Sequence, residues 1–394
     1  MPLRRLGRSA REAWEVPRDL LLGRYPAFVT GGVLARGEIP VFVFHGAEPE
    51  SFARKLDHLA RNGYRTLSVD EYTGILWGRV TPPERAVLLT FDDGRGSLWS
   101  VAAPLLKRHG MQAVVFLVPG RVPSHAPGPT WEDVEAGRAE PSVVLGREQA
   151  EGALASWEEI GALARTGVFD FQSHTLSHAR VHTGPSLAGF VTPKTQRGYD
   201  AFDQPLIRDG ERDRLGPDAS LGTPLLRSAP RTSEELRFFE DPEVRAACVT
   251  AVAEGGREGF FLRSDWESRL RSVFRRVRVT GRIETKQEQA AAIRHELVEA
   301  RRLIEDRTGR PVVHLCYPWH RAGATARRLA TEVGYETAFC GKVEGVPVTR
   351  PGGDPRAIAR LGEDYVELLP GRGRATLAGV LRGKWVRRFG RARG

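Results

Sequence analysis

The sequence predicts an α/β protein built on parallel strands, and three observations lead to this. Short continuous apolar runs, such as Ala86–Phe91 and Ala113–Val118, are typical of strands buried on both faces. Stretches with helical periodicity separate these runs, and residues that start and stop helices bracket them. This alternation indicates parallel strands with helices outside them, arranged as either a barrel or an open sheet.

The first elements follow from local pattern. Val41–Phe44 is a strand candidate, and Ser51–Asn62 carries an apolar face at helical spacing. Ser68 and Glu71 have the spacing of a capping box, so a further helix should start there. The helix between the two apolar strands should end near Gly110, because glycine is favoured just past a helix.

The same rhythm continues to residue 340. The expected elements are a helix from Ser156 to Thr166, a strand at Val168–Phe171, a long helix from Thr285 that ends before Gly309, a strand at Val312–Cys316, a helix at Ala324–Val333 and a strand at Thr337–Cys340.

Two stretches interrupt the rhythm. Arg121–Ala155 is rich in Pro and Gly before its helix, so we expect a long loop at the carboxyl end of the sheet. Arg180–Arg282 is dense in Pro, Arg and acidic residues, with helical patterns at Ser233–Phe239 and Asp265–Val277. This second stretch is interpreted as an insertion that forms a cap or subdomain.

Composition places the chain among soluble globular proteins. It has 394 residues, of which 41% are hydrophobic and 27% charged. No apolar run approaches the ~20 residues that span a bilayer, and Met1–Pro26 lacks the pattern of a signal peptide. Cys248, Cys316 and Cys340 occur singly, which argues against a disulfide framework. A cytoplasmic location is therefore expected.

The net charge of +10 includes a basic run with interleaved aromatics, Arg382–Arg393. Such a segment can contact an anionic membrane surface, or it can be a solvated tail. Peripheral contact with the inner membrane face is one expectation. Nucleic-acid binding is not expected, because no nucleic-acid motif accompanies the charge.

A pair of acids stands at the end of a buried strand, in Thr90-Phe-Asp-Asp-Gly94. Successive strand side chains point to opposite faces, so Asp92 and Asp93 converge only where the strand turns, and Gly94 can supply that turn. Ionised carboxylates at the end of an apolar strand need partners or a cation. Alone, however, Asp-Asp-Gly is more often a solvent-exposed acidic turn.

A pair of histidines favours a metal site over an exposed acidic turn. His174 and His178 follow another short strand, and if the segment takes one helical turn both imidazoles share a face. Two imidazoles and a carboxylate from a separate strand end form a ligand set with open positions, as a catalytic metal requires. The two pairs together predict a metal centre.

These segments resemble the motifs of the polysaccharide deacetylase family of carbohydrate esterases. Thr90–Gly94 is similar to the first motif and Ser173–His178 to the second. The resemblance covers roughly Ile39–Ser177 and Thr285–Gly341. It implies a distorted, incomplete (β/α) barrel, which the large insertion interrupts after the His-x-x-x-His motif. It also implies a divalent metal, usually zinc, with nickel, cobalt or manganese in some members.

The resemblance also implies roles for the four residues. Asp92 would be the general base, and Asp93 would be a metal ligand beside His174 and His178. The exchanged roles of the two aspartates stay open at this point. A divalent ion held by one carboxylate and two neutral imidazoles keeps net positive charge, and the second carboxylate is then free to accept a proton.

Leu315–His320 resembles the third motif, in which an aromatic-Pro segment lines the groove. This implies that the backbone N–H of Tyr317 helps to bind the developing oxyanion and that Trp319 stacks on a sugar ring. Barrel packing is the alternative for both aromatics. Cys316 and His320 stand where the family often carries Arg-Pro and Gly.

The acid that would protonate the leaving amine is the residue for which this sequence departs most from the family pattern. The family often has a late Leu-x-His motif, and this chain has no histidine after His320. His320 is the first candidate for the acid because it lies within the third motif. His45, which ends the first strand and is also a candidate substrate contact, is the second.

Competing motifs are weak. His295-Glu-Leu-Val-Glu299 lacks the second histidine of a metalloprotease helix, and the chain has no nucleophile elbow, phosphate-binding loop or dinucleotide fingerprint. The chain is therefore divided into a basic N-terminal segment (1–35), a catalytic barrel (36–180 and 284–370), an insertion (181–283) and a basic C-terminal tail (371–394).

The expected activity is hydrolysis of N-acetyl groups on a glycan or glycan precursor, with release of acetate. A cytoplasmic location favours a lipid-linked or nucleotide-linked sugar, or an oligosaccharide, with the insertion determining which one. Removal of O-acetyl or formyl groups at the same site, and non-catalytic glycan binding, are the alternatives.

Overall fold

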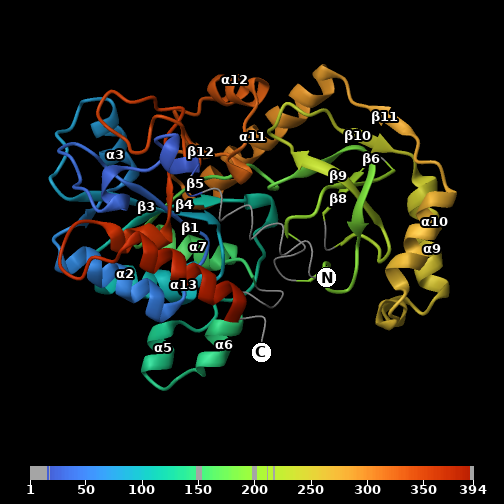
Figure 1. Ribbon diagram of the computed structural model, residues 1–394, viewed down its shortest axis with the longest axis horizontal. Coiled ribbons are helices and arrows are strands. Elements are labelled where there is room, and N and C mark those ends of the chain that lie inside the picture. Colours follow the sequence, from blue (N-terminus) through green and yellow to red (C-terminus); the bar gives the residue numbers. More distant parts are fainter. Residues whose placement is uncertain are drawn as a thin grey trace.

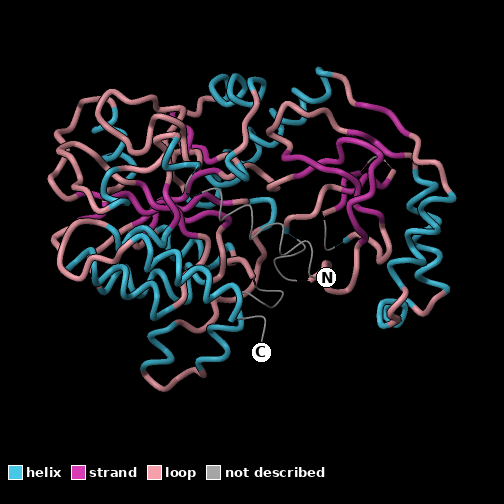
Figure 2. Tube along the Cα trace, viewed as in Figure 1, coloured by secondary structure: helices cyan, strands magenta, loops and turns pink. Residues whose placement is uncertain are grey.

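The computed structural model describes residues 16, 18–147, 153–197, 202–210, 212–215 and 218–390. The chain forms two lobes (Figure 1). The larger one, on the left of the view, contains a sheet wrapped by helices, and the smaller one on the right contains short antiparallel strands and two helices. Figure 2 shows the strands of the larger lobe gathered at its centre with helices outside them.

All strands of the large sheet are parallel. They are β1 (Val41–Phe44), β2 (Arg65–Thr66), β3 (Ala86–Asp93), β4 (Ala113–Leu117), β5 (Phe169–Ser173), β12 (His314–Cys316), β13 (Thr337–Phe339) and β14 (Leu361–Gly362). Their order is β13-β12-β5-β4-β3-β1-β14, with β2 also paired to β3. From β1 to β13 along this path, each strand therefore lies beside the next in chain order.

The sheet curls back on itself through one segment near the C-terminus. Phe339 in β13 forms a parallel bridge with Ile358, and three residues later Leu361 pairs with Phe42 in β1. The segment from Ile358 to Gly362 thus connects the last strand to the first. The fold is the distorted, incomplete (β/α) barrel that the family resemblance implied.

Capping boxes start three of the outer helices. Ser68, Ser156 and Thr285 each accept a hydrogen bond from the backbone N–H three residues later, and a glutamate returns the bond. The helices of this lobe include α2 (Pro49–Arg61), α3 (Val69–Leu76), α4 (Ala103–Arg108), α7 (Trp157–Ala164), α11 (Lys286–Thr308), α12 (Ala324–Val333) and α13 (Leu377–Gly390). The helix starts expected at Ser68, Ser156 and Thr285 and the end of α12 at Gly334 are confirmed. Helix α2 begins at Pro49, two residues before the expected start at Ser51.

Two apolar clusters lie on opposite faces of the strands. Val87, Leu89 and Phe91 of β3 pack with the outer helices, whereas Leu88 packs with Phe116 inside the barrel. This is the alternation of a pleated strand. It follows that Asp92, which continues the even-numbered series, points into the barrel interior.

The smaller lobe is formed by the insertion. Its strands pair antiparallel as β6 (Arg180–Phe190) with β9 (Pro224–Pro230), β7 (Ile207–Asp209) with β8 (Arg212–Arg214), and β10 (Phe238–Glu240) with β11 (Gly281–Ile283). Its helices are α9 (Pro242–Glu254) and α10 (Trp266–Arg276), and the latter confirms the helix expected at Asp265–Val277.

The helix expected at Ser233–Phe239 is wrong. The backbone N–H of Arg237 donates to Glu284, and Phe238 pairs with Ile283, so the segment enters strand β10. Glu284 also accepts a bidentate bond from buried Arg231 at 2.6 and 2.8 Å. Long-range pairing at the base of the lobe therefore overrides the local helical pattern.

Three further segments differ from simple expectation. The loop expected at Arg121–Ala155 contains two short helices, α5 (Trp131–Glu135) and α6 (Pro141–Gly146). Within the N-terminal segment, Phe28 and Val29 are buried in the outer cluster of the barrel. The described part of the C-terminal segment includes helix α13. In the described part of the chain no helix combines the length and the apolar character that a membrane crossing requires.

Candidate active site

The predicted site residues meet at the carboxyl ends of the barrel strands. Asp92 and Asp93 end β3, and His174 directly follows β5. Cys316 ends β12, and His45 directly follows β1. Loops at this face carry the active sites of (β/α) barrels in general, because the strand ends hold side chains from separate elements on one rigid frame.

Backbone strain is concentrated here. Among the described residues other than glycine, six have positive φ, and five of them belong to this face. The five are Asp93, Thr175, His178, Trp319 and His320. Such conformations cost on the order of 1–3 kcal/mol each and persist where surrounding structure enforces them. At Asp93, φ of 73° ends the strand alternation, so its carboxylate turns to the same side as Asp92.

Three side chains form a compact ligand set. Asp93 Oδ1 lies 3.7 Å from His174 Nε2 and 3.8 Å from His178 Nε2, and the three ligand atoms all lie within 4.8 Å of one another. These separations are too long for hydrogen bonds. Two atoms bound to one ion at about 2.0–2.2 Å are at most about 4.4 Å apart, so Asp93 and either histidine fit a shared cation.

The loop that carries both histidines is not a helical turn, so that part of the prediction is wrong. It bends with positive φ at Thr175 and His178. Glu296 of α11 holds the bend: its carboxylate accepts from Ser177 N at 2.9 Å and from Ser177 Oγ at 2.5 Å. The two imidazoles still converge, with ring centroids 5.0 Å apart.

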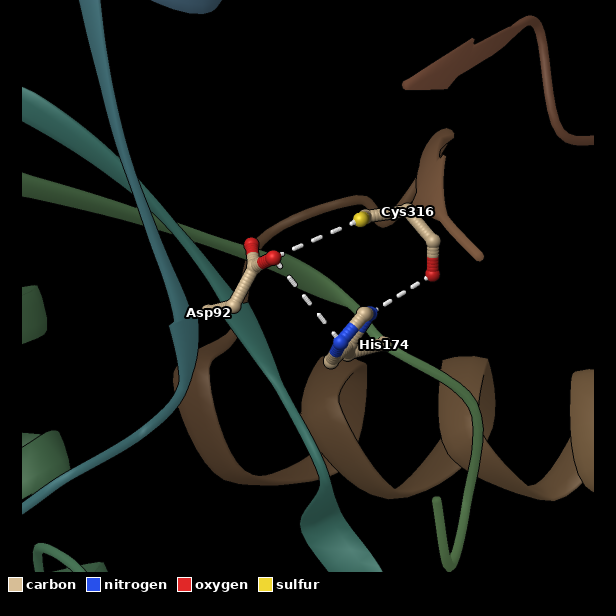
Figure 3. Close-up of side chains that lie close together, drawn as sticks. All are labelled: Asp92, His174 and Cys316. Carbon is tan, nitrogen blue, oxygen red and sulfur yellow. Dashed lines mark hydrogen bonds and ion pairs between the residues drawn. The ribbon is translucent and has the colours of Figure 1, made fainter. Parts of the chain in front are cut away.

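One ring nitrogen of His174 is fixed by the protein. Its Nδ1 lies 2.7 Å from the carbonyl oxygen of Cys316, as Figure 3 shows. A carbonyl only accepts, so Nδ1 carries the proton and Nε2 offers its lone pair towards Asp93 and His178. This is the arrangement that orients histidine ligands of metals.

His178 is buried against aromatic rings. Its imidazole lies 4.0 Å from the Trp319 ring and 4.9 Å from the Phe202 ring, measured between centroids. Burial, reinforced by the neighbouring His174, lowers the pKa of His178 to about 3. The ring is therefore neutral at ordinary pH, which is the form that binds a metal.

Asp92 has a different partner. Both its oxygens accept from Arg360, at 2.7 Å from Nη1 and 2.8 Å from Nη2. Burial raises the pKa of Asp92, but the adjacent guanidinium outweighs it and keeps that pKa well below its usual range. Arg360 is itself fully buried and also bonds Thr90 Oγ1 and the Cys340 carbonyl.

A second set of potential ligands shares His174. Asp92, His174 and Cys316 also lie close together (Figure 3), with 3.9 Å between the carboxylate and the imidazole and 3.8 Å between the carboxylate and the thiol. Arg360 donates to Cys316 Sγ at 2.9 Å as well as to Asp92. Burial also raises the pKa of the Cys316 thiol. A cation next to both groups and a protonated thiol disfavour a metal at this second set.

The aromatic motif lies beside the site, with its two aromatics in different settings. Trp319 is partly exposed and contacts two groups. Its ring lies tilted against the His178 imidazole, and the Arg180 guanidinium lies 5.0 Å from its ring centroid. Tyr317 is buried in the outer cluster, and its N–H donates to the Phe339 carbonyl at 3.4 Å. The Tyr317 N–H is thus directed to the neighbouring strand, which counts against its expected role as an oxyanion donor.

The two candidate acids differ in their surroundings. His320 Nδ1 lies 3.4 Å from Arg360 Nη2, so this nitrogen accepts rather than carries a proton. Dense surroundings and Arg360 lower the pKa of His320 to about 3, although its side chain keeps solvent access. His45 is exposed and lies within electrostatic range of both Asp92 and Asp93. The Arg360 contact thus disfavours His320 as the acid that protonates the leaving amine, which leaves His45 as the other candidate.

Sequence reasoning missed two residues of this site. Arg360 and Glu296 lie far along the chain from the residues they hold. Arg360 belongs to no motif noted there, and Glu296 was considered only within His295–Glu299. Arg360 follows the apolar pair Ile358-Ala359, and these two residues were the only sequence sign that a short strand precedes it. Glu296 sits on an apolar stripe of α11, between Ile293 and Ala300, where a carboxylate is unexpected.

Comparison with known proteins finds a family match over part of the chain. Residues 79–199, which contain both the Asp-Asp and the His-x-x-x-His segments, match the family model described as polysaccharide deacetylase. The poly-beta-1,6-N-acetyl-D-glucosamine N-deacetylase of Escherichia coli O157:H7 is 27% identical over 209 residues, which is 52% of this chain and 29% of that protein. The chain thus spans less than a third of that relative.

Two solved structures are also similar, at 16% identity each. A de-N-acetylase from Aggregatibacter actinomycetemcomitans aligns with a TM-score of 0.48 over 82% of this chain and 94% of its own. IcaB from Ammonifex degensii aligns with a TM-score of 0.46 over 85% of this chain and 97% of its own. Residues 79–199 thus match the polysaccharide deacetylase family, and the side chains of both motifs gather at one face of the barrel.

Proposed function

We propose that the protein is a metal-dependent deacetylase that hydrolyses N-acetyl groups on a saccharide and releases acetate. One observation carries the proposal: two adjacent carboxylates have different partners. Asp93 faces two imidazole nitrogens at 3.7 and 3.8 Å, whereas Asp92 is bound on both oxygens by Arg360. This supports Asp93 as the ligand and Asp92 as the base, and disfavours the exchanged roles.

Asp93, His174 and His178 would hold the ion. Zinc fits this donor set of two imidazoles and one carboxylate, and nickel, cobalt or manganese can occupy similar sets. When bound, such an ion polarises the acetyl carbonyl and lowers the pKa of its water. The protein fixes the donors in advance through the Cys316 carbonyl on His174 and through Glu296 on the histidine loop.

Asp92 would accept the proton of the attacking water. Its pair with Arg360 keeps the carboxylate ionised and therefore ready to accept, and the bidentate contact fixes its orientation. His45 would deliver a proton to the leaving amine nitrogen from the end of β1. Trp319, at the rim, offers a ring face on which a sugar can stack.

The substrate class follows from the relatives and from one cavity. The Escherichia coli relative is named for poly-beta-1,6-N-acetyl-D-glucosamine, which supports a substrate containing N-acetylglucosamine. A cavity of about 750 Å³ that includes His320 is lined by Arg327, Arg328, Lys342 and Arg356, with Asp354 as its one carboxylate. This positive lining supports a precursor that carries phosphate, such as a nucleotide-linked or lipid-linked sugar.

The test is acetate release from a panel, with metal content quantified in each preparation. The panel contains neutral N-acetylglucosamine oligomers, a nucleotide-linked N-acetyl sugar and matched O-acetyl sugars. Asp92→Asn should lower kcat by about 10²–10⁴-fold while the bound metal is retained. Asp57→Asn, on the exposed side of α2, is the matched control and should keep full activity.

The acid is tested separately. His45→Gln should lower kcat on N-acetyl substrates by about 10²-fold or more, and His320→Gln should leave most of it. Equal activity of Asp92→Asn and the unchanged protein would refute the assigned base. An unchanged rate in His45→Gln with loss in His320→Gln would return the acid role to His320.

A further inference from the structure

The metal ligand His178 has one ring nitrogen that the barrel leaves unsatisfied. Its Nε2 faces Asp93, but its Nδ1 is buried and has no hydrogen-bond partner. Buried polar groups in proteins nearly always have a partner, and a ligating histidine usually donates its second N–H to a carboxylate or carbonyl. His174 follows that rule through Cys316, and His178 breaks it.

A carboxylate from the insertion stands at this nitrogen. Asp203 Oδ1 lies 3.7 Å from His178 Nδ1, about half an ångström beyond the longest ordinary hydrogen bond. The Asp203 side chain is 51% exposed, so it is free to rotate through that distance. The cations that act on Asp203 are Arg180, Arg121 and Arg95, and an arginine side chain offers no acceptor to the N–H.

The residue before Asp203 anchors the segment to the barrel. Phe202 is buried with Val118 and Leu154, two residues of the barrel lobe. Its ring also lies 4.9 Å from the His178 ring, and the Arg121 guanidinium stacks over it at 4.7 Å. Just after Asp203, Leu206 N donates to the Arg180 carbonyl at 2.9 Å. Contacts on both sides therefore hold Asp203 at the metal ligand.

We propose that the insertion completes the metal centre, with Asp203 as a positioning residue that accepts a hydrogen bond from His178 Nδ1–H. The bond fixes the tautomer that directs the Nε2 lone pair at the metal and makes that nitrogen a stronger donor. This inference rests on the proposed metal site. It gives the insertion a role in the chemistry besides any role in choosing the sugar.

The experiment measures zinc affinity by competition with a chromophoric chelator in the full-length protein. Asp203→Ala should weaken zinc binding by about 10–100-fold. Asp203→Asn keeps an acceptor oxygen without the charge and should fall between Asp203→Ala and the unchanged protein. Asp218→Ala removes an exposed carboxylate elsewhere in the same insertion and should leave zinc affinity unchanged.

A second readout separates positioning from general support of the fold. In ¹⁵N spectra of the zinc-loaded protein, His178 should show a slowly exchanging Nδ1 proton that becomes fast-exchanging in Asp203→Ala. Equal zinc affinity and an unchanged His178 tautomer in Asp203→Ala would overturn the inference. Absence of zinc binding by the unchanged protein would instead refute the proposed function itself.

Discussion

The barrel and the insertion lobe are stabilised in different ways. In the barrel, two apolar clusters cover both faces of one parallel sheet, and aromatic rings such as Phe44 and Phe91 stack 5.0 Å apart within the outer cluster. In the insertion, a small cluster around Cys248 and Leu270 lies between two helices. Exposed ion pairs such as Arg269–Asp265 lie on its surface.

The barrel and the insertion lobe therefore contribute differently to the site. The barrel holds Asp92 and His174 rigidly, because Arg360 binds Asp92 and the Cys316 carbonyl binds His174 from distant elements. The lobe reaches the site through few residues, chiefly Phe202, Asp203 and Arg180. Change in the lobe should therefore alter ligand positioning and substrate choice, whereas change in the barrel should remove the site or unfold it.

The largest expected effect on stability comes from breaking the buried pair inside the barrel. Arg360→Met leaves Asp92 buried without a cation, and breaking such a pair costs about 3–5 kcal/mol. Urea denaturation followed by tryptophan fluorescence measures the loss. Arg302→Met, which removes an exposed arginine from its pair with exposed Asp306, is the control and should cost about 1 kcal/mol or less. Equal losses in the two variants would contradict the importance assigned to Arg360.

The same variant should reverse the pH dependence contributed by Asp92. In the unchanged protein the pKa of Asp92 lies below its unfolded value of about 3.9, so its contribution is complete above pH ~4 and is lost below it. Without Arg360, burial raises that pKa above ~3.9, and stability is then lost as pH rises through the new value. The stability gap between the two proteins should narrow from pH 7 to pH 4. Denaturation at three pH values measures it, and a constant gap would refute the pairing.

An intermediate effect is expected from the core of the insertion. Leu270→Ala removes a fully buried side chain from the cluster of α9 and α10, which costs about 2–5 kcal/mol. Because the lobe has its own core, the loss should appear as faster amide exchange in α9 and α10 with β3 and β4 still protected. Leu262→Ala, at an 89% exposed position of the same lobe, is the control. Equally faster exchange in the barrel strands would show that the two lobes unfold as one unit.

The smallest effect concerns the basic C-terminal segment, for which we propose peripheral contact with an anionic membrane surface at the cytoplasmic face. Each Lys or Arg near such a surface contributes about 1 kcal/mol. Deleting residues 382–394 retains Leu377 and Val380, which pack against the barrel, and should reduce co-sedimentation with anionic liposomes. Neutral liposomes serve as the control. Undiminished binding after the deletion would remove the support for this contact.

Much of the site was visible in the sequence because its motifs are local. Asp92 and Asp93 end one apolar strand, and His174 and His178 lie four residues apart after another. Helix starts were equally local, since a capping box needs only a side chain and the backbone three residues away. The insertion lobe resisted prediction because its short strands depend on distant partners, as at Phe238 and Ile283.

The sequence by itself indicated a resemblance to one family, parallel strands that alternate with helices, and the four residues at the centre. Only the tertiary structure decided how those four differ. Asp92 and Asp93 are neighbours of the same chemical type, and no local pattern distinguishes them. Arg360 does so from 268 positions away by binding Asp92, while two imidazoles face Asp93. Partners at such separations are set by the closure of the barrel and the packing of the insertion, which periodicity and spacing along the chain do not encode.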